Sequence, residues 1–236
     1  MNYTNNGTAR MSYDMVRSNL YNAWIKSFGG NAKQCWDYID GLKLAQHDVR
    51  VENTLTANNT NYIFGVIDNQ QSTTGIQFRT EQRLKQQDTL ICTEFSVYVG
   101  LPTSDADIFW ERQTYANPVV FAAADAALIN GAVFSQGKLK ITVNGDVIVP
   151  GRQLFANLYK PQTQQTAALG AGSPATEVRG AVDGYVTAEP NLYLIGSKGT
   201  IPEIIIPGAL VGLGTAQARI GIEFRGFLAQ NSTVIS

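Results

Sequence analysis

One histidine and a small group of carboxylates are the side chains of this sequence best suited to catalysis. His47 is the only histidine, so a Ser-His-Asp or Cys-His mechanism would have to use it. The surrounding residues, LKLAQHDVRVEN, have none of the features of a nucleophile elbow or a papain-like cysteine site. We therefore expect His47 to be a partly exposed side chain beside Asp48, without a catalytic role.

The segment PTSDADIFWERQ brings together Asp105, Asp107 and Glu111. Oxygen ligands at this spacing could bind calcium, and two of the carboxylates could act as acid and base. However, the segment lacks the glycine spacing of a calcium-binding loop, and the sequence offers no second acidic cluster to pair with it. A solvated loop that enters a short helix is the favoured interpretation.

The segment PGALVGLGT, residues 207–215, places Gly208, Gly212 and Gly214 close together. It resembles a phosphate-binding loop only superficially, because the Lys-Ser/Thr pair of a P-loop is missing. The strand and helix that should flank such a loop are also not indicated by the sequence. We expect a turn between two strands.

The two cysteines, Cys35 and Cys92, are far apart in sequence, and both lie in apolar patterns. We expect two buried thiols and no disulfide, since disulfide-stabilised secreted folds carry more cysteines. One histidine and two distant cysteines are also too few ligands for a structural zinc site. No cofactor or metal is therefore expected.

Composition and charge exclude several partners. Charged residues make up only 16% of the 236 residues, against roughly a quarter in an average soluble protein, and Asn, Gln, Thr, Ser and Gly replace them. The net charge is −1, from 18 basic and 19 acidic residues, with neither sign clustered. Strong direct nucleic-acid binding and binding to an anionic membrane surface are therefore not expected.

The sequence also lacks a segment that predicts secretion or membrane insertion. The most apolar window, IPEIIIPGALVGLG, is interrupted by Pro202, Glu203 and Pro207 and is too short to span a bilayer. The first ten residues, MNYTNNGTAR, do not have the charged and then apolar arrangement of a signal peptide. We expect a protein made in the cytoplasm, without a transmembrane segment and without membrane contact.

Residues 1–50 are expected to form an N-terminal arm and a helical segment. A helix is predicted over residues 12–28, with Ser12 as N-cap and Gly29-Gly30 as the stop signal. Its apolar residues recur every four positions and form one stripe: Val16, Leu20, Trp24 and Phe28. The stripe packs either on the protein's own sheet, which is favoured, or on a partner subunit. A shorter helix is expected over residues 32–44.

Residues 51–236 are expected to form a single β domain, with strands from about residue 60 onward. The strand-like runs are NYIFGVI, GIQFRT, TLICTEFSVYVG, KLKITV, DVIV, EIII and ARIGIEFRGFLA. A hairpin is predicted over residues 138–149, where Asn144-Gly145 supplies the two positive-φ residues of the turn and Pro150-Gly151 ends the second strand.

Three further patterns complete this domain. FAAADAALI, residues 121–129, predicts a helical interruption, and residues 160–181 carry so little apolar pattern that we expect a long surface loop. The last strand alternates clearly. Its apolar residues Ile220, Ile222 and Phe224 face one way, and its charged residues face the other: Arg219, Glu223 and Arg225.

Several of these features together resemble the coat subunits of icosahedral viruses, tailless bacteriophages in particular. They are the short polar arm, the N-terminal helix, many strands joined by loops rich in Pro, Gly and Asn, low charge, the loop KPQTQQTAA, and the final segment RIGIEFRGFLAQNSTVIS. The resemblance implies a mainly β fold, an antiparallel β-sandwich of the jelly-roll type with an N-terminal α-helical segment.

The same resemblance implies a function. A capsid subunit of this kind would reside in the virion and assemble with copies of itself and with other virion proteins into an icosahedral shell, without enzyme activity. Many coat proteins carry a basic N-terminal arm, which this sequence lacks. The genome charge would then have to be neutralised by other proteins, counterions or an internal membrane.

Two other functions remain open. A receptor- or carbohydrate-binding β-sandwich module, of the phage fibre or spike type, would display exposed aromatic rings at one end. Trp110 is the candidate ring, because Trp24 and Trp36 fall in helical patterns and are expected in the core. An enzyme on a β scaffold would instead use the carboxylates of residues 105–111.

Overall fold

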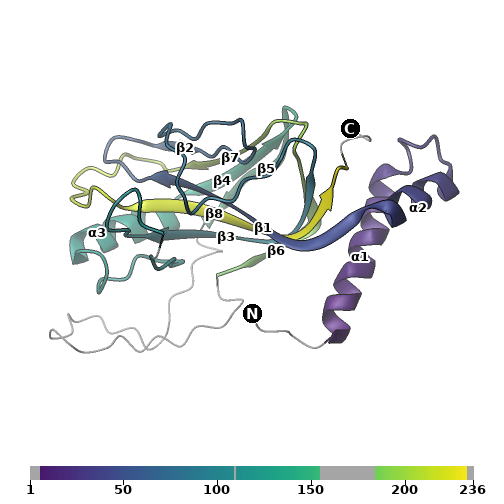
Figure 1. Cartoon of the computed structure of the whole chain (residues 1–236). Coiled ribbons are helices and arrows are strands. Elements are labelled where there is room, and N and C mark those ends of the chain that lie inside the picture. The colour runs from purple at the N-terminus through teal and green to yellow at the C-terminus, as the bar shows by residue number, and fades with distance from the viewer. Residues whose placement is uncertain (1–5, 109, 155–183, 233–236) are drawn as a thin grey trace.

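The computed structural model describes residues 6–108, 110–154 and 184–232, which form a mainly β structure (Figure 1). The strands are β1 (Lys43–Thr54), β2 (Asn61–Ile63), β3 (Thr89–Gly100), β4 (Lys138–Val143), β5 (Asp146–Gln153), β6 (Val186–Ile195), β7 (Thr200–Ile205) and β8 (Arg219–Gln230). The helices are α1 (Asn6–Trp24), α2 (Ala32–Gly41), α3 (Ala123–Leu128) and the π-helical segment η1 (Ile129–Phe134).

The strands form two four-stranded sheets. The first, which we call sheet A, has the strand order β1-β8-β3-β6, and the second, sheet B, has the order β2-β7-β4-β5. Neighbouring strands are antiparallel throughout both sheets. The prediction of a mainly β protein with antiparallel, sandwich-like sheets is therefore confirmed.

The main apolar core lies between the two sheets, because each strand turns alternate side chains inward. In β8 the inward side chains are Ile220, Ile222 and Phe224, as the sequence pattern predicted. They share one apolar cluster with Leu139 and Ile141 of β4, on the opposite sheet. Burial of these side chains from both sheets holds the layers together.

The predicted helical interruption lies between β3 and β4. It consists of α3 followed directly by η1, so it extends beyond the expected residues 121–129 to Phe134. Ile129, Val133 and Phe134 of η1 are buried in the core between the sheets. This burial explains why the helical segment extends beyond residue 129.

Helices α1 and α2 pack against the outer face of sheet A, at the end where β1 begins (Figure 1). A second apolar cluster combines residues from both helices with outward-facing residues of β3 and β8: Val16, Leu20, Cys35, Ile39, Ile91, Phe227 and Ala229. Trp24, Phe28 and Trp36 pack around its rim. The apolar stripe of the first helix therefore contacts the protein's own sheet.

The helix boundaries differ from those predicted. α1 begins at Asn6, before the expected cap Ser12, because residues 9–11 are Ala, Arg and Met, which favour helix. It ends at Trp24, and residues 25–30 continue as hydrogen-bonded turns. α2 ends at Gly41, short of the expected residue 44, because the following residues pair with β8 as the start of β1.

Strands begin earlier than the sequence indicated. β1 pairs with β8 along its whole length and runs across residues 50 and 51, so the expectation of strands only from about residue 60 is wrong. Residues 75–80 are irregular, with a turn at residues 79 and 80, and do not form the predicted strand, while β6 was not predicted. β6 contains Pro190, which its place at the edge of sheet A tolerates. The predicted loop 160–181 falls outside the described residues.

The predicted hairpin is formed by β4 and β5, with Asn144 (φ 53°) and Gly145 (φ 85°) in its turn. The expectation that Pro150-Gly151 ends the second strand is wrong, because β5 continues to Gln153. Pro150 is tolerated since β5 is an edge strand, and Gly151 (φ 114°) lies at an irregularity in the pairing.

Candidate functional site

His47 lies in the middle of β1, opposite Gly226 of β8, and is partly buried. Its Nε2 atom is 3.3 Å from Nε2 of Gln82, a neutral amide. Within the described residues, no hydrogen bond joins His47 to a hydroxyl, a thiol or a carboxylate. The histidine is therefore not part of a nucleophile–base pair in this structure.

The three carboxylates of the loop 102–113 contact three different partners. Asp105, 57% exposed at its side chain, lies 3.5 Å from Nη2 of Arg219. Asp107 accepts hydrogen bonds from the backbone N–H and the hydroxyl of Thr103, at 3.0 and 2.9 Å. Glu111 accepts one from a neighbouring glutamine at 3.4 Å. The described part of this segment is irregular and forms no helix, contrary to expectation.

Residues 207–215 form the turn region between β7 and β8 that the sequence predicted. Asp125 of α3 fixes its end, because the carboxylate accepts hydrogen bonds from the hydroxyl of Thr215 and from the backbone N–H of Gly214, the latter at 3.0 Å. The bond from Thr215, followed by that from Gly214, lowers the pKa of Asp125. This glycine-rich segment is therefore a loop whose end is anchored by Asp125.

Cys35 and Cys92 are buried free thiols in separate apolar clusters. Burial raises the pKa of both thiols, so neither is a ready thiolate nucleophile at neutral pH. Across the three described ranges, no group of three or more His, Cys, Asp or Glu side chains could hold a metal ion.

A buried group of polar side chains occupies the outer face of sheet A. Glu52 of β1 and Arg219 of β8 are fully buried, and Oε2 of the first lies 3.3 Å from Nη1 of the second. Glu52 also accepts hydrogen bonds from the hydroxyls of Thr80, at 2.7 Å, and Tyr98, at 3.2 Å. The buried carboxylate therefore has a counter-ion and two O–H donors, which offset the cost of removing it from water.

Aromatic rings cover the guanidinium group of Arg219. Its Cζ atom lies 3.9 Å from the ring centroid of Phe78 and 5.8 Å from that of Trp110, within the range of cation–π attraction. The Trp110 ring lies over Gly100, where any Cβ atom would overlap it. Trp110 is therefore partly buried over a charge and does not form a freely exposed platform for a sugar.

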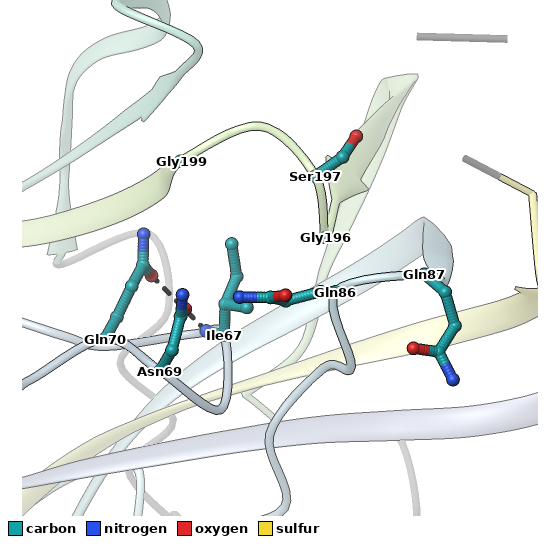
Figure 2. A pocket seen from close by; sticks show the side chains of 8 residues that line it. All are labelled: Ile67, Asn69, Gln70, Gln86, Gln87, Gly196, Ser197 and Gly199. Carbon is teal, nitrogen blue, oxygen red and sulfur yellow. Dashed lines mark hydrogen bonds between the residues drawn. The ribbon is translucent and has the colours of Figure 1, made fainter. Parts of the chain in front are cut away.

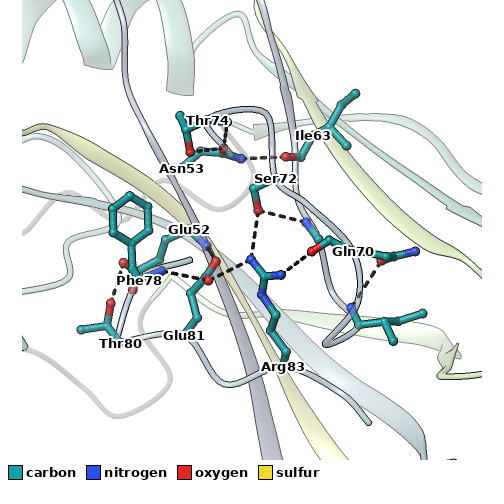
Figure 3. A network of polar contacts seen from close by, with 12 residues as sticks. Glu52, Asn53, Ile63, Gln70, Ser72, Thr74, Phe78, Thr80, Glu81 and Arg83 are labelled. Carbon is teal, nitrogen blue, oxygen red and sulfur yellow. Dashed lines mark hydrogen bonds and ion pairs between the residues drawn. The ribbon is translucent and has the colours of Figure 1, made fainter. Parts of the chain in front are cut away.

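A second buried ion pair, between Glu81 and Arg83, lies beside Glu52 (Figure 3). Oε2 of Glu81 is 2.9 Å from Nη2 of Arg83, and both side chains are almost completely buried. Glu81 also accepts hydrogen bonds from the backbone N–H groups of Glu52, at 2.9 Å, and Phe78, at 3.1 Å. Arg83 donates to the backbone carbonyl of Gln70. The pair thus ties the loop between β2 and β3 to β1.

Burial raises the pKa values of two acidic side chains in this network, Glu81 and Tyr98. Loss of solvation raises the pKa of Glu81 and outweighs the stabilising hydrogen bond from Glu52 N–H and the charge of Arg83. Burial, followed by the negative charge of Glu52, raises the pKa of Tyr98 well above its ordinary value. Perturbed acids can mark catalytic sites. Here, however, their oxygens already bond to protein groups, so the arrangement indicates a structural network.

The sequence contained a signal for this network that local patterns do not reveal. The outward charges of β1 are Asp48, Arg50 and Glu52, and those of β8, read in reverse, are Arg225, Glu223 and Arg219. Antiparallel pairing places Asp48 opposite Arg225 and Arg50 opposite Glu223. Aligning the two strands in opposite directions could therefore have predicted both the pairing and the ionic face.

A polar pocket of about 570 Å³ lies between two parts of the β2–β3 loop and the β6–β7 turn (Figure 2). Its lining residues are Ile67, Asn69, Gln70, Gln86, Gln87, Gly196, Ser197 and Gly199. Gln70 is used internally, since its Oε1 accepts the N–H of Ile67 at 3.3 Å. The other lining amides and the hydroxyl of Ser197 make no hydrogen bonds to described residues. The lining of the pocket is neutral and polar, and it offers no acid, base or aromatic ring.

Comparison with known proteins found no relative of this chain. No protein-family model, no curated protein and no solved structure matches the chain. Within the described ranges, the helices lack the length and apolar character needed to cross a bilayer. The function of this chain must therefore be inferred from its fold and its surfaces.

Proposed function

We propose that this chain is a virion structural protein, a capsid subunit with a jelly-roll fold that assembles into an icosahedral shell. The strand pairing carries the proposal. β1 pairs with β8, β2 with β7, β3 with β6 and β4 with β5, so the chain behaves like one long hairpin. The β3–β8 and β4–β7 pairings then roll this hairpin into two sheets.

This nested order supports the jelly-roll type, in which eight strands form two Greek keys. Viral coat domains are a frequent use of that fold, but lectins and cupins share it, so the fold alone does not decide the function. The surface adds support. Low charge without a basic cluster limits repulsion between many copies in one shell, and it favours proteins over nucleic acid as partners.

The buried polar network also fits a structural role better than a catalytic one. Its carboxylates are bonded to arginine, hydroxyl and backbone N–H groups, and it fixes the loop between β2 and β3 on sheet A. A rigid subunit is useful in a shell, because contacts between ordered surfaces cost less conformational entropy. A structural role in the virion, without enzyme activity, is therefore part of this proposal.

The polar pocket favours a second candidate function, a receptor- or carbohydrate-binding module of the phage fibre or spike type. Its volume is within the range of small-ligand sites, and its amides could bind hydroxyl groups. The lining lacks an aromatic ring on which a sugar could stack, and Trp110 is engaged with Arg219. This candidate is therefore supported less well than a shell subunit.

Light scattering on a size-exclusion column, followed by negative-stain microscopy, tests the proposal. We expect rings of five or six copies, or closed particles, at high protein concentration. A species that stays monomeric or trimeric would overturn the shell assignment. Glycan-array binding that is lost on Gln86→Ala would then establish the second candidate, with Gln153→Ala, on the distant edge strand β5, as the matched control.

A further inference from the structure

The outer face of sheet B differs from that of sheet A because no described helix packs on it (Figure 1). It carries apolar side chains in open positions: Ile63 is 37% exposed, Ile205 39% and Val147 49%. These side chains come from three different strands of one sheet. Exposed apolar side chains that gather on one face of a sheet can contribute to a contact with another protein.

The strand register arranges the outward side chains in rows. Because Leu139, Ile141 and Val143 of β4 point into the core, the residues between them point outward. The central row, read from β2 to β5, contains Ile63, Glu203, Lys140 and Pro150. The rows on either side contain Asn61, Ile205, Lys138 and Gln153, and Ile201, Thr142 and Val147.

One ion pair occupies the centre of this face. Nζ of Lys140 on β4 is 3.4 Å from Oε2 of Glu203 on β7, and the side chains are 34% and 18% exposed. The two strands are the inner strands of sheet B. A positive and a negative charge therefore lie side by side at the centre, and both apolar and polar side chains surround them.

This arrangement is self-complementary. If a second copy faces the first across a two-fold axis parallel to the strands and between β4 and β7, the two inner strands exchange places. Glu203 then faces the partner's Lys140, and Lys140 faces the partner's Glu203. Ile63 faces the partner's Pro150, and Ile205 lies over the aliphatic part of the partner's Lys138. A two-fold axis perpendicular to the strands would instead place Lys140 opposite the partner's Lys140, and Glu203 opposite the partner's Glu203.

We propose that the outer face of sheet B is a dimer interface between two copies of this chain, formed about that axis. The occupant is a second copy because the same face supplies both halves of the charge pattern. This proposal rests on the self-assembly proposed above and names one of its contacts.

The interface is expected to be weak when it acts alone. Four strands spaced about 4.8 Å apart and about 20 Å long give a footprint of roughly 400 Å² per copy. Stable complexes bury about 800 Å² per partner, so association in the micromolar range or weaker is expected. A closed assembly would strengthen it, because many contacts form together.

Charge reversal tests the interface by sedimentation or light scattering, at roughly 100 μM to match the weak affinity. Lys140→Glu alone and Glu203→Lys alone oppose like charges across the axis, and each should reduce dimer formation at least tenfold. An equimolar mixture of the two variants should associate again. In that mixture every charge between chains is complementary, whereas each chain still carries a like-charge pair within itself. Recovery therefore reports the contact between chains.

Two further variants complete the test. Ile205→Lys, which faces the partner's Lys138, should also weaken association. Val211→Asp, at the most exposed apolar side chain of the β7–β8 turn region, should leave it unchanged. Thermal unfolding checks that each variant is folded. The proposal is overturned if either charge variant associates like the unaltered chain, or if the mixture stays monomeric.

These experiments can distinguish a wrong interface from a wrong shell assignment. If the charge variants still form rings or particles as the unaltered chain does, the shell assignment stands and this interface is wrong. If the unaltered chain forms dimers that dissociate on charge reversal, yet no larger assembly appears, the interface stands and the shell assignment is wrong.

Discussion

The two outer faces of the sandwich carry the same kind of ion pair in opposite surroundings. On sheet A, Glu52 and Arg219 are 0% and 1% exposed and lie under aromatic rings. On sheet B, Glu203 and Lys140 join neighbouring strands in the same way but remain partly exposed to water. In the described part of the chain, helices and loops cover the outer face of sheet A, whereas no described helix covers that of sheet B.

The degree of burial decides how much a charge pair contributes to the free energy of unfolding. A buried pair must remain intact, because removing one partner leaves a charge without solvent or counter-ion. An exposed pair contributes little to folding, since water and salt replace the lost partner. The covered face should therefore govern stability, and the open face should govern association.

The largest effect is expected for Arg219→Ala. The change leaves the Glu52 carboxylate buried without its cation and should lower the free energy of unfolding by about 3–5 kcal/mol. Urea denaturation measures it. The double variant Glu52→Gln with Arg219→Met removes both charges and should cost clearly less. A loss below about 1 kcal/mol for Arg219→Ala would mean that the network is not a unit of stability.

A smaller loss is expected where α1 covers sheet A. Leu20 is completely buried between the helix and the sheet, so Leu20→Ala should destabilise the protein by roughly 2–4 kcal/mol through lost burial and a cavity. Met15 on the same helix is 51% exposed, and Met15→Ala is the matched control. Equal unfolding midpoints for the two variants would contradict the assignment of the helix to the covered face.

The pH dependence of stability gives a finer comparison. Because burial raises the pKa of Glu81 above its ordinary value of 4.5, the folded state favours the protonated acid. Its contribution to stability is present below pH 4.5 and is lost as the pH rises through the raised pKa. Glu81→Gln removes this titration. The variant should therefore gain stability relative to the unaltered chain between pH 4.5 and neutral pH.

Denaturation at a series of pH values measures that difference. A fixed cost from the weakened contact with Arg83 is expected at every pH, so only the slope is diagnostic. A constant difference between the two proteins across the series would show that Glu81 titrates normally.

The smallest effect is expected on the open face. Lys140→Ala should change the free energy of unfolding by no more than about 1 kcal/mol, because its partner Glu203 stays in contact with water. Chemical denaturation at low protein concentration isolates the monomer. A loss as large as that of Arg219→Ala would erase the difference between the two faces.

Local features of the fold could be predicted from the sequence, and long-range ones could not. The Asn144-Gly145 turn and the alternation in β8 follow from short-range sterics and burial, and both predictions are confirmed. β1 and β6 were missed because their patterns depend on partners far along the chain. Pro150 was misread because its effect depends on whether its strand is at an edge, which the local sequence does not contain.

The candidate site was predicted less well than the fold. Arg219 and Glu223 were correctly placed on the outward side of β8, yet they are buried, because loops from elsewhere cover them. Trp110 drew attention as a possible exposed ring, and its actual position over Gly100 depends on the packing of that loop on β3. The side of the sheet to which a side chain points follows from the alternation along its own strand. Whether that side chain is buried depends on what the rest of the chain places over it.

The position of β8 has a consequence for the order of events during protein synthesis. β8 lies between β1 and β3 in sheet A, although it is the last described strand to leave the ribosome. Until then β1 and β3 have no shared neighbour, and the carboxylate of Glu52 has no Arg219. Sheet A must therefore form after most of the chain is made. This favours slow folding and a period in which unpaired strand edges need protection from aggregation.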